Sequence, residues 1–170
     1  MKPLSPPDSH HLLAAQGWLE LGNHAEANEE LEQIAPQLHA HPDVLEVRWH
    51  ICSHVNKWDA CVDIAGAIIK LDPARPDAWI HRSFALHELK RTQEAFDLLL
   101  SAADKFPEPW TIPYNLACYC AQLGRLDECE SWFDKAMAID EASVRQAAND
   151  DPDLQPLWDR HSGTNGKPAE

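Results

Sequence analysis

The amino-acid sequence repeats itself with a period of 34 residues, and this repeat constrains the fold more than any other feature. Positions one period apart are small or apolar in four separate columns. The columns are Ala27, Cys61, Ala95 and Cys129; Trp18, Cys52, Leu86 and Cys120; Leu31, Ala65, Leu99 and Phe133; and Ile34, Ile68, Ala102 and Ala136. A fixed period of this length is typical of repeat architectures, in which one supersecondary unit stacks on the next.

Within each period, the apolar positions predict two amphipathic helices joined by a short turn. In the second period, apolar residues recur every three to four positions on either side of Asn56 and Lys57, which is the spacing of one helix face. These residues are Leu45, Trp49, Cys52 and Val55, followed by Cys61, Ile64, Ala65, Ile68 and Leu71. The segment 72–77 then contains two prolines, which end one hairpin before the next begins.

The period and the two-helix pattern resemble those of the tetratricopeptide-repeat family. The matching residues are the early aromatic Trp79, the turn glycines Gly22 and Gly124, the small residues Ala27 and Ala95, and the closing prolines Pro73 and Pro107. The sequence departs from the family pattern where Asn56 and Lys90 replace the turn glycine. The resemblance implies an all-α fold, a right-handed superhelical solenoid of four helix–turn–helix repeats with a C-terminal capping helix.

We expect the domain organisation to follow the repeat. The expected segments are a flexible N-terminus at 1–8, four repeats within 9–140 (9–41, 42–75, 76–109 and 110–140), a C-terminal cap at 141–160 and a flexible tail at 161–170. The period fails after Asp140. Leu154, Leu157 and Trp158 are then available to cover the open end of the stack.

The composition indicates which partners and which cellular location to expect. A net charge of −14 repels phosphate backbones and anionic lipids, so neither nucleic acid nor a membrane is expected as a partner. The sequence contains neither an apolar run of about 18 residues nor a signal-peptide pattern at Met1. The five cysteines lack the C-x-x-C spacing of metal and redox motifs, and we expect them to pack as small apolar residues in a reducing cytoplasm.

The resemblance implies that the first helix of each repeat lines a concave groove in which a peptide lies extended. The side chains expected to bind a partner are Gln16, His50, His54, His81, Phe84, His87, Tyr114 and Asn115. The Asn115 amide would hold the peptide backbone, and Phe84 and Tyr114 would pack against its side chains. Family members that grip the carboxylate tails of chaperones use lysines and an arginine at groove positions. The corresponding positions here hold none, which argues against such a clamp.

These observations favour a non-catalytic protein–protein interaction module that binds a peptide or protein in its concave groove. No catalytic motif is present, and we expect no enzyme activity, cofactor or metal. One alternative is an assembly subunit that docks through an apolar edge, which exposed tryptophans such as Trp58, Trp110 or Trp132 would favour. Another is a metal- or pH-responsive binder built on His50, His54 and His81.

Overall fold

The computed structural model describes residues 3–164, and all secondary-structure elements in that range are helices, which confirms the all-α class. The chain forms two compact units, Met1–Ala85 (unit 1) and Leu86–Glu170 (unit 2). The boundary between them falls inside α5 (Pro76–Glu88).

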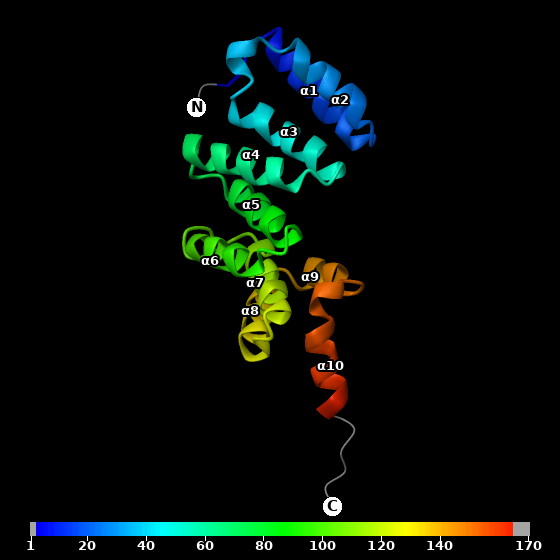
Figure 1. Cartoon of the computed structure of the whole chain (residues 1–170), viewed down its shortest axis with the longest axis vertical. Coiled ribbons are helices and arrows are strands. Elements are labelled where there is room, and N and C mark those ends of the chain that lie inside the picture. The colour runs from blue at the N-terminus through cyan, green and yellow to red at the C-terminus, as the bar shows by residue number, and fades with distance from the viewer. Residues whose placement is uncertain (1–2, 165–170) are drawn as a thin grey trace, which may run out of the picture. The chain divides into compact units, whose positions relative to one another are not determined.

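Unit 1 contains two helical hairpins and the first part of α5. Its elements before α5 are α1 (Asp8–Glu20), α2 (His24–Gln33), the 3₁₀ helix η1 (Pro36–Leu38), α3 (Pro42–His54) and α4 (Trp58–Leu71). Helix α1 pairs with α2 and α3 pairs with α4, while α3 also packs against α1 and α2 (Figure 1). The two hairpins therefore share one interior.

Unit 2 contains the end of α5 and the remaining helices. These are α6 (Thr92–Ala103), α7 (Thr111–Gln122), α8 (Leu126–Ile139), α9 (Glu141–Ala148), the 3₁₀ helix η2 (Pro152–Leu154) and α10 (Gln155–Thr164). Helix α7 pairs with α8 and is also contacted by α6, η2 and α10, while α9 packs against α8. Helix α7 is consequently the most enclosed element of this unit, with nine buried residues among its twelve.

The periodic columns of the sequence form the interior of both units. Ala27, Cys61, Ala95 and Cys129 are all completely buried. In the column that runs through Leu31, the residues Ala65 and Leu99 are completely buried as well. A small side chain at each such position lets two helices approach closely without leaving a void, which close-packed interiors require.

The turns that join the paired helices share one backbone geometry. Gly22, Asn56, Lys90 and Gly124 have φ angles of 73°, 55°, 62° and 73°, all in the left-handed region. After Lys90, for example, the amide of Arg91 donates to the carbonyl of Leu86 at 2.9 Å, which closes the helix end with the pattern typical of a glycine cap. The turn therefore keeps its shape at the two positions where the sequence departs from glycine.

The cysteines are all free thiols, four of them buried and Cys52 half-buried. Burial raises the pKa of Cys61 to about 11 and that of Cys120 to about 12. These thiols are protonated near neutral pH and pack as small apolar groups.

The two chain ends expected to be flexible lie only partly within the described residues, which exclude 1–2 and 165–170. Leu4 packs against the interior of unit 1, and the Asp8 carboxylate accepts a hydrogen bond from the amide of Ala35 at 2.7 Å. At the other end, α10 continues to Thr164.

Candidate functional site

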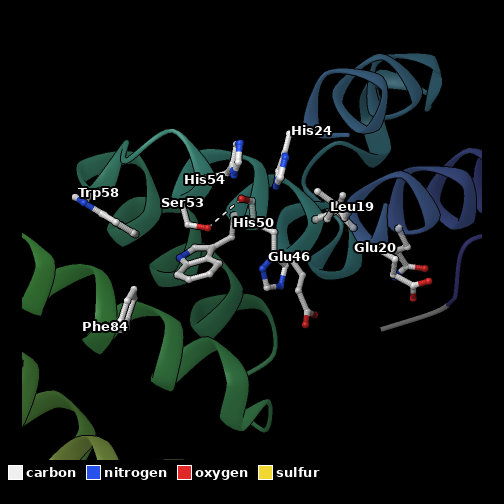
Figure 2. A pocket seen from close by; sticks show the side chains of 12 residues that line it. Leu19, Glu20, His24, Glu46, His50, Ser53, His54, Trp58 and Phe84 are labelled. Carbon is white, nitrogen blue, oxygen red and sulfur yellow. Dashed lines mark hydrogen bonds between the residues drawn. The ribbon is translucent and has the colours of Figure 1, made fainter. Parts of the chain in front are cut away.

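Unit 1 contains an open groove of about 660 Å³ that is lined by side chains from all five of its α-helices. The lining residues are Gln16, Leu19 and Glu20 of α1, His24 of α2, Glu46, Val47, Trp49, His50, Ser53 and His54 of α3, Trp58 of α4, and Phe84 of α5. Helix α3 contributes half of them because its i, i+3, i+4 and i+7 positions share one face. The groove therefore lies along α3 (Figure 2).

A stack of aromatic rings joins α3 to α5 beside the groove. The Trp49 indole, which is 5% exposed, lies parallel to the His81 imidazole with 3.9 Å between ring centroids. His50 meets each of these rings edge-on at 5.2 Å. The Trp49 Nε1 and His81 Nδ1 atoms are buried and have no hydrogen-bond partner within residues 3–164. Such unpaired buried atoms are rare and unfavourable in a folded protein.

Burial determines the charge of these imidazoles. It lowers the pKa of His81 to about 4, with the nearby His50 adding to the effect. It also lowers the pKa of His50 below its ordinary value, although the Asp77 carboxylate partly opposes this. Both rings are therefore neutral near pH 7.

A second pair of imidazoles lies in the groove, one at the start of α2 and the other at the end of α3. The rings of His24 and His54 stack with their centroids 3.4 Å apart and their planes 7° from parallel. His24 Nδ1 donates to the carbonyl oxygen of Gly22 at 3.0 Å, so this nitrogen carries the proton. The stacked rings thus connect the start of α2 to the end of α3 and form part of the groove lining.

The remaining lining differs along the groove. Figure 2 shows the carboxylates of Glu20 and Glu46 toward one end and the rings of Trp58 and Phe84 toward the other. The two rings meet edge to face at 5.7 Å, and Phe84 is 38% exposed. The groove thus combines a polar, anionic end with an apolar one.

The Glu46 carboxylate belongs to a cluster of charges around one guanidinium. Arg75 donates to Glu46 at 3.0 Å, to Asp72 at 3.1 Å and also to Asp43. Burial raises the pKa of Glu46, and Arg75 opposes that rise. The exposed Glu20 makes no ion pair with any residue of the described chain.

In unit 2, the chain itself covers the polar side chains of α7. The Tyr114 hydroxyl donates to the Asp151 carboxylate at 2.5 Å, and the Cys118 thiol lies 3.6 Å from the same oxygen. Burial raises the pKa of Tyr114, and the hydrogen bond to Asp151 raises it further. Tyr114 is consequently a hydrogen-bond donor at every physiological pH.

The next acidic residue of this segment makes a second set of contacts. The Asp153 carboxylate accepts from His87 Nε2 at 3.0 Å, and its main-chain carbonyl accepts from the Gln122 amide at 2.9 Å. Leu154 and Leu157 follow and are almost completely buried. The segment 149–157 is held on α7 by both polar and apolar contacts.

The structure brings together only part of the predicted binding set. Gln16, His50, His54 and Phe84 line the groove of unit 1, whereas His81 lies beside it against Trp49. His87 and Tyr114 lie in unit 2 and contact the segment 149–157, and Asn115 is half-buried on α7.

Sequence reasoning missed several residues of the groove: Leu19, His24, Trp49, Ser53 and Trp58. His24 and Trp58 are one period apart, and each stands two residues after a turn position of positive φ. The repeat itself could therefore have indicated this position as part of the groove.

Two other kinds of site are absent from residues 3–164. No group of three or more potential ligands there could hold a metal ion. None of the helices is both long enough and apolar enough to cross a membrane.

Comparison with known proteins points to one family. A tetratricopeptide-repeat family model matches residues 114–143, whereas a search of curated proteins finds no significant match. Among solved structures, MamA from Desulfovibrio magneticus RS-1 superimposes with a TM-score of 0.70 and 15% identity, covering 98% of this chain and 100% of that one. A thermophilic TPR protein from Thermus thermophilus gives 0.70 and 14%, covering 92% and 89%. PilF from Pseudomonas aeruginosa gives 0.70 and 16%, covering 95% and 78%.

Proposed function

Because this chain is a tetratricopeptide-repeat protein, we propose that it is a non-catalytic module that binds a protein or peptide partner in the groove of unit 1. The fold supports protein–protein interaction in general, since stacked repeats present extended surfaces. The observation that carries the proposal is the open groove itself, about 660 Å³ in volume and lined by both aromatic and polar side chains. This volume is within the range of known ligand sites.

The side chains of the groove suit a peptide. Phe84 and Trp58 offer rigid apolar surface, which anchors most binding energy in protein interfaces. His50, Ser53 and Gln16 supply polar groups along the same face. A peptide that lies along α3 would therefore bury side chains at one end of the groove and meet polar groups at the other.

Unit 2 supports the choice of unit 1 as the binding surface. Tyr114 and His87 already bond to Asp151 and Asp153 of the same chain, so a partner would have to displace this segment to reach them. Leu154 and Leu157 would then lose their burial, which makes displacement unfavourable. We therefore leave Tyr114 and His87 out of the proposed binding set.

The alternative of docking through an apolar edge has less support. Trp58, Trp110 and Trp132, whose exposure would favour it, are each at least partly buried. The exposed large apolar residues are instead spread over several helices and helix ends: Leu13, Leu21, Val55, Leu71, Phe84, Leu100 and Ile139.

The cytoplasmic location expected from the sequence stays a prediction.

A phage library of random peptides about twelve residues long tests the proposal. The full chain is immobilised, and selected peptides are synthesised with a dye and titrated by fluorescence anisotropy. We expect Phe84→Ala and His50→Ala each to weaken binding by about tenfold, because both side chains line the groove.

Leu13→Ala is the matched control, since Leu13 is 68% exposed on α1 and does not line the groove. It should change affinity by less than about twofold. Thermal unfolding of each variant separates loss of binding from loss of fold. Selected peptides that bind the wild type and the Phe84 and His50 variants equally well would exclude the groove as the binding site.

A further inference from the structure

We propose that the groove of unit 1 selects a cationic peptide, one that places basic side chains against the Glu20 and Glu46 carboxylates at one end of the groove and against the aromatic rings at the other. This inference rests on the proposed function, because it defines the chemistry of the partner that the same groove would hold. Three features of the groove support it.

The first feature is the sign of the charge in the groove. Its twelve lining residues include two carboxylates, Glu20 and Glu46, and neither a lysine nor an arginine. Glu20 is exposed and makes no ion pair within the described residues, so its charge is available to a ligand. An acidic ligand would find no cation there, whereas a basic one would find a free carboxylate.

The second feature is the surplus of negative charge beside Glu46. Three carboxylates, those of Asp43, Glu46 and Asp72, surround the single guanidinium of Arg75. All three nitrogens of that guanidinium already donate to carboxylates. Three carboxylates thus share the one positive charge of Arg75, and the cluster keeps an excess of negative charge.

The third feature is the aromatic lining at the other end of the groove. The Trp58 and Phe84 rings lie toward the opposite end of the groove from Glu20 and Glu46 (Figure 2). The face of such a ring attracts a guanidinium or ammonium group, so one basic side chain of the peptide can gain from the rings while another gains from the carboxylates. His50 and His81 contribute no positive charge near pH 7, because burial lowers the pKa of each.

The polar side chains of unit 2 show the opposite chemistry. There the Tyr114 hydroxyl, the His87 imidazole and the Gln122 amide all donate, and what they hold is the acidic segment with Asp151 and Asp153. The donors of Tyr114 and His87 thus hold two carboxylates of the same chain. By the same logic, a groove that offers acceptors and aromatic rings takes cations.

The test uses three dye-labelled peptides of about twelve residues with capped ends and identical tryptophan and leucine content. They differ only at four positions, which hold arginine, glutamine or glutamate. Anisotropy titrations of the full chain should show the arginine peptide binding at least about tenfold tighter than the glutamine peptide, and the glutamate peptide weakest. The difference should shrink between about 50 and about 300 mM NaCl, because salt screens exposed charges.

Two variants that change the net charge equally separate the groove from the general acidity of the protein. Glu20→Lys should weaken the arginine peptide about tenfold, whereas Glu29→Lys, at an exposed position on α2 outside the groove, should do so by less than about twofold. Equal effects of both variants would overturn the inference, because the attraction would then be nonspecific. Failure of the arginine peptide to bind would overturn it too.

The Phe84→Ala variant distinguishes this inference from the proposed function. If the glutamine peptide binds as tightly as the arginine peptide and Phe84→Ala weakens both, the inference fails while the groove remains the binding site. If peptides bind and Phe84→Ala changes none of their affinities, both the inference and the proposed function fail.

Discussion

At the residue scale, His81 makes the free energy of unfolding depend on pH. Its imidazole is stacked on Trp49 and its pKa falls from the ordinary 6.5 to about 4 because burial disfavours the charged form. Between these values the unfolded chain binds a proton that the folded chain does not. The free energy of unfolding therefore decreases as pH falls from about 6.5 to about 4, and the contribution of His81 is fully present only above about 6.5.

We predict that the titration of His81 alone lowers the free energy of unfolding by about 2 kcal/mol when the pH falls from about 7.5 to about 5. The measurement is urea unfolding of the wild type and of His81→Phe at both pH values, since phenylalanine keeps a flat ring beside Trp49 and cannot be protonated. The variant should lose about 2 kcal/mol less than the wild type over this range. The same loss in both proteins would mean that His81 is not buried as described.

At the scale of elements, the segment after α9 is attached to α7 through a few polar contacts whose strength can be measured. The Tyr114 hydroxyl and the Asp151 carboxylate lie 2.5 Å apart at a partly buried position. We predict that Tyr114→Phe lowers the free energy of unfolding by about 1–3 kcal/mol, because the change leaves a carboxylate without its main donor. Urea unfolding followed by circular dichroism measures this loss.

A double-mutant cycle attributes that loss to the pair. Asp151→Asn and the double variant are measured in the same way, and the interaction energy should be about 1 kcal/mol or more. An interaction energy near zero would show that the segment is held by Leu154 and Leu157 alone.

Considering the whole molecule, the repeat explains which parts of the structure were predictable. Each helical hairpin is specified locally, so the buried column of Ala27, Cys61 and their equivalents could be read from spacing alone. The contact of Tyr114 with Asp151 could not, because it joins a repeat to a segment in which the period has failed. The stacking of His24 on His54 could not be predicted either, since it depends on how two neighbouring hairpins pack.

The net charge of the whole chain leads to a further prediction. Twenty-eight acidic against fourteen basic residues give a charge of −14. The excess acidic side chains repel one another most strongly in the compact folded state, which lowers its stability. Salt weakens long-range repulsion more than it weakens short, partly buried ion pairs such as those of Arg75. Raising NaCl from about 10 to about 200 mM should therefore raise the melting temperature by about 2–4 °C, which corresponds to about 1 kcal/mol for a chain of this length.

Thermal unfolding followed by circular dichroism measures this effect, and Glu29→Lys provides the matched control. Removing one exposed negative charge and adding a positive one reduces the excess from −14 to about −12, so the variant should melt higher in low salt and gain less from added NaCl. A melting temperature that falls with salt would mean that the ion pairs around Arg75 and Arg160 outweigh the repulsion. In that case a cationic partner would stabilise the protein only through contacts in the groove, and not by neutralising the charge of the molecule as a whole.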